Sequence, residues 1–247
     1  MRIFENVNIL ENGDILIKSN TENFHHIYNV LRVKVGEKVE VVDVLSKKLY
    51  ITEVKDKFGK LTVEKIIESE ENKSKITIYQ AAIKGERFEY FLEKTTELGV
   101  DRIKVIPLKR NVVKFKENEI AKMEERFRNI LESSSKQSRR VNIPEIKILG
   151  DMKQTLKEIE KEDIVFVLYE NILEDSISMK KMVDTIIEGK YKNIGIVIGA
   201  EGGIDISEIE ELRKCENIKI VTLGKRILRA ETAGVSVMSI LNYELER

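Results

Sequence analysis

The amino-acid sequence predicts an α/β protein with a mainly parallel sheet, preceded by a small β-rich unit. From residue 76 onward, apolar runs rich in Val and Ile alternate with segments of helical periodicity. These runs show little polar alternation, which is typical of parallel strands buried on both faces. The first 70 residues instead carry short β-branched runs separated by glycines. That spacing is typical of a small barrel.

The β-rich unit is predicted to contain one short helix, at Glu22–Leu31, among its strands. The expected strands are Asp14–Lys18, Val39–Leu45, Lys48–Lys55 and Leu61–Ile67. A polar, charged stretch from Glu68 to Lys75 follows and lacks large apolar side chains. We therefore expect a domain boundary there, with one domain over residues 1–70 and the other over residues 73–247.

The second domain is predicted to alternate strands with helices. The expected strands are Ile76–Ile83, Ile103–Leu108, Ile164–Tyr169, Ile194–Ile198 and Ile218–Leu223. The expected helices are Glu86–Leu98, Glu117–Gln137, Asp151–Glu160, Ile177–Glu188, Ser207–Lys214 and Ala230–Leu245. Gly99 is placed to end the first helix in a left-handed conformation, and Asp205 with Glu208 fits a capping box. Small residues in the last helix fit either an intramolecular contact or a dimer seam.

Composition and charge limit the partners and sites that the sequence allows. The 43 basic and 43 acidic residues cancel, so overall charge gives no argument for nucleic acid. The local distribution of charge does give such an argument, because residues 104–116 and 219–229 contain bases and no acids. The alternative is that these bases are ordinary solvated surface charges.

A single cysteine excludes an internal disulfide and a cysteine-built zinc site, and we expect no metal. Without a long apolar run or a signal-like start we expect a cytoplasmic protein with no membrane partner.

Two glycine-rich turns are the strongest functional signal. Ile198-Gly-Ala-Glu-Gly-Gly203 and Leu223-Gly-Lys-Arg-Ile-Leu-Arg-Ala-Glu-Thr-Ala233 each follow an apolar run and lead into a helix. Open α/β sheets bind ligands at the carboxyl ends of neighbouring strands. The turns therefore predict a small-molecule pocket beside a polyanion site. The alternatives are an ordinary strand-to-helix turn, and a loop that Ile227 and Leu228 merely anchor.

A pair of arginines follows the long helix. Arg139 and Arg140 lie in Lys136-Gln-Ser-Arg-Arg-Val-Asn-Ile-Pro144. Arginine donates bidentately to phosphate, so a pair at a helix end suits contact with an RNA backbone. A solvated helix terminus is the alternative.

The combination and order of these motifs resemble the bacterial 16S ribosomal RNA uridine-N3 methyltransferases of the SPOUT, or trefoil-knot, superfamily. Further matches are His26-Ile-Tyr-Asn-Val-Leu-Arg32, Lys84-Gly-Glu-Arg followed by Lys94-Thr-Thr-Glu-Leu-Gly99, and Gln137-Ser-Arg-Arg140 followed by Pro144. Two positions depart from the family pattern. Ala200 replaces a proline, which leaves the backbone freer, and Lys136 replaces a glutamate near the expected RNA face.

The resemblance implies a PUA-like N-terminal barrel that holds RNA and a C-terminal domain closed by a trefoil knot. It also implies a homodimer that binds S-adenosylmethionine in the knot and acts on 16S rRNA in the small ribosomal subunit. The cofactor residues implied are Leu168, Gly199, Ala200, Glu201, Gly202, Gly203, Leu223, Gly224, Ile227, Leu228 and Thr232. The expected RNA contacts are Arg2, Arg32, Lys84, Arg87, Arg110, Arg139, Arg140 and Arg226.

Methyl transfer to uracil N3 needs an unpaired base and loss of the N3 proton. We expect Arg229 to stabilise the charge that develops on the uracil oxygens, with Glu201 or Glu231 as the proton acceptor. Two other hypotheses stay open. One is a methyltransferase of the same fold that modifies another RNA position, and the other is a relative that binds RNA without catalysis.

Overall fold

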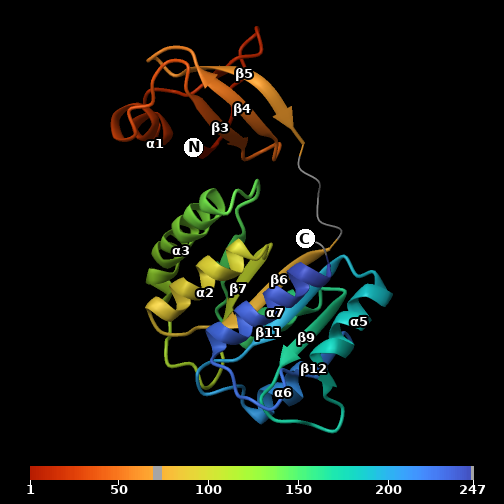
Figure 1. The fold of residues 1–247 in the computed structure, drawn as a ribbon. Coiled ribbons are helices and arrows are strands. Elements are labelled where there is room, and N and C mark those ends of the chain that lie inside the picture. Colours follow the sequence, from red (N-terminus) through yellow and green to blue (C-terminus); the bar gives the residue numbers. More distant parts are fainter. Residues whose placement is uncertain (69–73, 246–247) are drawn as a thin grey trace. The chain divides into compact units, whose positions relative to one another are not determined.

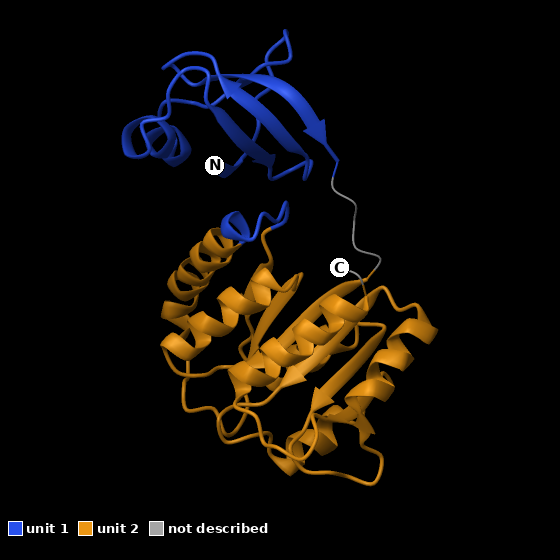
Figure 2. Ribbon diagram, viewed as in Figure 1, with its two compact units in different colours: residues 1–71, 135–142 blue, residues 72–134, 143–247 orange. Residues whose placement is uncertain are grey.

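The structure is a computed structural model that describes residues 1–68 and 74–245. The chain divides into two compact units, one of residues 1–71 with 135–142 and one of residues 72–134 with 143–247 (Figure 2). The predicted domain boundary, between residues 70 and 73, lies outside the described residues.

The first unit is a curled five-stranded sheet in the order β1-β3-β4-β5-β2. Its elements are β1 (Arg2–Glu5), β2 (Ile15–Leu16), α1 (Glu22–His25), η1 (His26–Val30), β3 (Lys38–Asp43), β4 (Leu49–Val54) and β5 (Lys60–Ile67). The four predicted strands are present. The expected single helix is instead a short α-helix that continues as one π-helical segment. Strand β1 was not predicted, because it holds only two apolar residues, Ile3 and Phe4.

The second unit is an α/β domain with a seven-stranded sheet (Figure 1). Its elements are β6 (Lys75–Ala81), α2 (Glu86–Glu97), β7 (Arg102–Ile106), α3 (Glu117–Gln137), β8 (Glu145–Ile148), α4 (Met152–Ile159), β9 (Ile164–Leu168), β10 (Ile177–Ser178), α5 (Met179–Gly189), β11 (Asn193–Ile198), α6 (Ile206–Leu212), β12 (Ile218–Thr222) and α7 (Ala230–Glu244). The strand pairs are all parallel, as predicted.

The strand order is β10-β12-β9-β11-β6-β7-β8. Strand β12 thus pairs between β9 and β10, which both precede it in the chain. Strands β8 and β10 were not predicted. The first has only two isoleucines in alternation, and the second is two residues long, so neither gives a buried apolar run.

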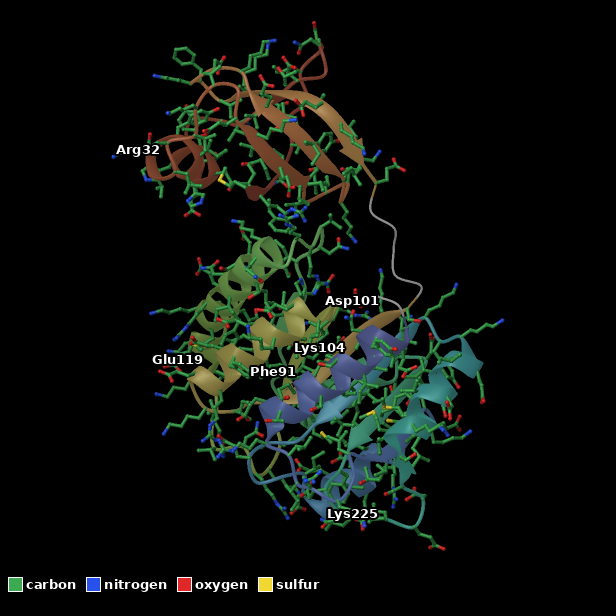
Figure 3. The ribbon with its side chains drawn as sticks, in the orientation of Figure 1. Arg32, Phe91, Asp101, Lys104, Glu119 and Lys225 are labelled. Carbon is green, nitrogen blue, oxygen red and sulfur yellow. The ribbon has the colours of Figure 1, made fainter. Side chains whose placement is uncertain are left out.

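Alternate side chains of the strands feed two separate cores. One core joins the sheet to α2, α3, α5 and α7, and the other joins it to α4 and α6. Helices α2 and α7 lie side by side on the same face (Figure 1). Their contact is close, because a Cβ on Gly234 would lie 2.5 Å from the Phe91 ring. The small residue Gly234 of α7 therefore serves a contact within the chain, with Phe91 of α2 (labelled in Figure 3).

Predicted helix ends are confirmed at two places. Gly99 has a φ of +91° directly after α2, and Asp205 with Glu208 forms a capping box on α6. None of the helices in residues 1–68 and 74–245 combines the length and hydropathy needed to span a bilayer. The same residues hold no cluster of three or more His, Cys, Asp or Glu side chains suited to a metal ion.

Candidate cofactor pocket

A cavity of about 280 Å³ opens at the carboxyl ends of β9, β11 and β12. Three segments line it, namely residues 168–170, residues 198–203 and positions between 222 and 233. The two glycine-rich turns that the sequence singled out therefore meet across one pocket. This is the edge at which α/β sheets place their ligands.

Most of the predicted cofactor residues lie in the wall of this cavity. The lining includes Leu168, Gly199, Ala200, Glu201, Gly202, Gly203, Leu223, Gly224, Ile227 and Leu228. Thr232 does not line the cavity; it is exposed in the first turn of α7. Arg226, predicted as an RNA contact, also lines the cavity. Apolar and polar groups thus share the wall, as in small-molecule sites generally.

The first turn closes tightly and depends on Gly203. Its N–H donates to the Ala200 carbonyl at 2.9 Å, and its φ is +73°. A Cβ at Gly203 would lie 2.1 Å from Glu170 Oε1, so a side chain there would collide with that carboxylate. Glycine is favoured at this position by its backbone angle, and an added Cβ would force the Glu170 carboxylate to move.

Glu170 is a lining residue that the sequence analysis missed. It follows the buried strand β9 by two positions, so its place at a carboxyl strand end was the signal available. Unlike Glu201, it makes no ion pair within residues 1–68 and 74–245. A carboxylate of this kind accepts hydrogen bonds from hydroxyl or ammonium groups of a ligand.

The loop after β7 braces the outside of the turn. Arg110 donates to the Gly202 carbonyl at 3.0 Å and to Asp205 at 3.1 Å. Lys109 donates its backbone N–H to Glu208 at 2.8 Å. Hydrogen bonds from the Ser207 side chain and backbone lower the pKa of Asp205 against the effect of burial, with a further contribution from Arg110. The guanidinium of Arg110 is thus committed to the pocket wall.

A second ion pair links the turn to α2. Arg87 Nη1 lies 3.4 Å from Glu201 Oε1. Both side chains are partly exposed, so the pair contributes little to stability. Its effect is local, because it places a cation predicted to contact RNA beside a carboxylate in the pocket wall.

The three predicted catalytic residues lie close together in the chain's fold but differ in exposure. Glu201 lines the cavity. Arg229 is exposed and is the N-cap residue of α7, whose Ala230 and Ala233 line the cavity. Glu231 is 8% exposed, and no group in the described parts of the chain hydrogen-bonds with its Oε2. Glu231 lies in the first turn of α7.

The predicted RNA residues divide between the two units. In the first unit Arg32, labelled in Figure 3, is exposed and has a φ of +52°. Arg2 is only 8% exposed at its side chain. It pairs with Glu40 at 2.8 Å and donates to the carbonyls of Arg139 and Arg140. Arg2 therefore holds the arginine segment rather than presenting its own guanidinium. Lys84, Arg87, Arg110 and Arg226 belong to the second unit.

Comparison with known proteins identifies the family. A model of the RNA methyltransferase domain matches residues 70–242, and a model of the RNA methyltransferase PUA domain matches residues 20–68. The chain belongs to the RNA methyltransferase family. The PUA match also agrees with the barrel predicted for the first unit, and the α/β fold of the second unit is that of the family.

Relatives of this RNA methyltransferase carry consistent names. The ribosomal RNA small subunit methyltransferase E of Bacillus subtilis is 30% identical over 91% of this chain and 89% of its own length. The Aquifex aeolicus protein of that name is 29% identical over 93% and 94%. A Legionella pneumophila methyltransferase solved with bound cofactor SAM is 26% identical, with a TM-score of 0.76 over 98% of this chain and 96% of its own.

Proposed function

We propose that this RNA methyltransferase uses S-adenosylmethionine to methylate N3 of a uridine in the 16S rRNA of the small ribosomal subunit. The observation that carries the proposal is the meeting of the two glycine-rich turns in one pocket at the strand ends. The names of the relatives support the substrate class, and the cofactor of the Legionella protein supports the donor.

The pocket suits S-adenosylmethionine in its chemistry. Leu223, Ile227 and Leu228 offer apolar surface for a heterocycle. Glu170 offers a carboxylate for hydroxyl or ammonium donors, and the backbone of the 199–203 turn can approach a ligand closely. When bound, the cofactor supplies a methyl group on a positively charged sulfur. We propose that the ten lining residues predicted from sequence hold it, with Thr232 close by.

The remaining chemistry falls to the residues around the pocket. Uracil N3 carries a proton and is a poor nucleophile until the proton leaves. We propose that Glu201, in the pocket wall, accepts it, and that Arg229 stabilises the charge that spreads to the uracil oxygens. Glu231 is the alternative acceptor, because one of its carboxylate oxygens is buried without a hydrogen bond in the described structure.

We propose that exposed cationic side chains contact the RNA and that two other arginines hold backbone segments in place. Arg32, Lys84, Arg87, Arg139 and Arg226 are exposed and suit phosphate groups, and we add Arg140 from the same segment as Arg139. Arg2 and Arg110 are instead proposed to hold backbone segments in place, because their guanidinium groups are hydrogen-bonded to carbonyls.

Three broader features belong to the same proposal. We propose that the protein works as a homodimer, in the cytoplasm, on small ribosomal subunits. We also propose that residues 1–70 and residues 73–247 are its two domains. Ile227 is 83% exposed although it lines the pocket, which fits a site that a ligand or a second subunit covers.

The proposal is tested by methyl transfer from labelled S-adenosylmethionine to isolated small subunits, followed by digestion to nucleosides. The expected product is 3-methyluridine in 16S rRNA. Label in a ribose methyl or in another base would favour a different methyltransferase of this fold. Failure to bind the cofactor in calorimetry would favour an RNA-binding relative without catalysis.

A further inference from the structure

Phe58 is an aromatic side chain displayed to solvent at the tip of the hairpin between β4 and β5. It is 80% exposed, whereas the other phenylalanines of the chain are all buried or half-buried. A fully displayed phenyl ring gains nothing in folding, because its apolar surface remains in water. The ring is therefore available to a binding partner.

The tip that carries Phe58 is held rigidly. Asp56 Oδ1 accepts the N–H of Phe58 at 2.8 Å and that of Lys60 at 3.1 Å. Gly59 accepts from the Ile17 N–H at 2.9 Å and has a φ of +99°. A Cβ on Gly59 would lie 2.1 Å from the Ile17 carbonyl oxygen, so the hairpin tip packs directly against the backbone at Ile17. A ring presented on such a tip loses little backbone entropy when it binds.

The surface around the ring is basic. Lys55, Lys57 and Lys60 belong to the same hairpin, and the Lys55 side chain is 54% exposed. The acids nearby are turned inward or occupied. The Asp14 side chain is 7% exposed and pairs with Lys60 at 3.2 Å and with Lys55 at 3.7 Å, and Asp56 Oδ1 accepts two backbone N–H groups. The exposed Phe58 ring is therefore flanked in the hairpin by two exposed lysines, Lys55 and Lys57.

We propose that Phe58 stacks on an unpaired base of the RNA substrate while Lys55 and Lys57 face the neighbouring phosphates. Single-stranded RNA is bound in this way, by aromatic platforms within a positively charged surface. A protein partner fits less well, because lysine is depleted at the centres of protein interfaces. The inference rests on the proposed function only in taking RNA as the partner.

The test uses the full chain and a fluorescent single-stranded RNA of about 12 nucleotides, within the range of such sites. Binding is followed by anisotropy, beside a duplex of equal length. The variants are Phe58→Ala, Phe58→Leu and Phe58→Tyr. Leu45→Ala is the matched control, since Leu45 is also 80% exposed and lies next to lysines 47 and 48 in the loop between β3 and β4. Circular dichroism and thermal unfolding check that each variant is folded.

Stacking predicts that Phe58→Ala and Phe58→Leu each raise the Kd for the single strand about fivefold to 100-fold. Phe58→Tyr should bind like the wild type, Leu45→Ala should change nothing, and duplex binding should not respond. Equal binding by Phe58→Ala and wild type would overturn the inference. So would full binding by Phe58→Leu, which would point to a general apolar contact such as a protein partner.

Failure of the proposed function has a different signature. If the wild type bound single strands through Phe58 but left small subunits unmethylated, the function would be wrong and the stacking site would stand. If Phe58→Ala methylated small subunits with unchanged KM and also bound single strands normally, only the stacking site would be wrong.

Discussion

Arg110 and Asp205 are joined by a hydrogen bond of 3.1 Å between Nη2 and Oδ2. The same guanidinium donates to the Gly202 carbonyl. The loop after β7 thereby braces the 199–203 turn from outside the pocket lining. The arrangement gives Arg110 a positioning role that its place in a basic stretch did not suggest.

Replacing Arg110 by Ala should weaken S-adenosylmethionine binding about threefold to tenfold, since partly exposed charged hydrogen bonds are lost from the turn. Isothermal titration calorimetry measures this change in the Kd for S-adenosylmethionine. Arg213→Ala is the matched control, because Arg213 also pairs with an aspartate, Asp175, but away from the pocket lining. Wild-type affinity in Arg110→Ala would show that the turn needs no brace.

Gly203→Ala should weaken cofactor binding, because Glu170, which lines the pocket, has to move aside for the added methyl group. The new Cβ would meet the Glu170 carboxylate at 2.1 Å and would also have to adopt a φ of +73°. Gly36→Ala separates the two effects, because Gly36 has a φ of +91° and nothing within 4 Å of the added Cβ. Both variants should lose about 1 kcal/mol of stability, and only Gly203→Ala should bind the cofactor more weakly. A normal Kd for Gly203→Ala would refute the steric argument.

Glu170→Gln should weaken binding of S-adenosylmethionine roughly tenfold, the scale of one charge-assisted hydrogen bond. The nucleoside methylthioadenosine, which lacks the amino-acid group, tells which donor is recognised. Loss for both ligands would assign Glu170 to the ribose hydroxyls, and loss for the cofactor alone would assign it to the ammonium group. Unchanged affinity for both would remove Glu170 from the binding site.

Arg229→Ala should lower kcat about 100-fold to 1000-fold, as when one donor to a developing negative charge is lost. Cofactor affinity should stay near that of the wild type, because Arg229 does not line the cavity. Single-turnover methylation with saturating small subunits measures the chemical step. Near-normal turnover would contradict the electrostatic role.

Asp205 should make stability depend on pH in acid. Its pKa is held below the ordinary value of 3.8, chiefly by hydrogen bonds from Ser207. A lowered folded-state pKa gives a contribution that is complete above about 3.8 and disappears as the pH falls through the folded-state value. The stability difference between wild type and Asp205→Asn in urea titrations should therefore shrink below that pH. A difference independent of pH would show that the charge of Asp205 does not matter.

The sequence was sufficient where a pattern is local. Buried runs such as Ile194–Ile198 and the Asp205–Glu208 box report their own structure, and the glycine turns follow directly from the strands that carry them. Contacts between segments far apart in the sequence leave no local pattern from which they could be predicted. The hydrogen bond from Arg110 to Gly202 spans 92 positions, and the burial of Arg2 depends on Glu40 and the 139–140 carbonyls. Both arginines therefore resembled phosphate ligands in the sequence alone.

The location of the methyl donor tests the account most directly. A crystal structure of the protein with S-adenosylmethionine should show the donor between the 199–203 turn and residues 223–228, with Glu170 hydrogen-bonded to it. A donor bound at another edge of the sheet, with these two turns empty, would contradict the account.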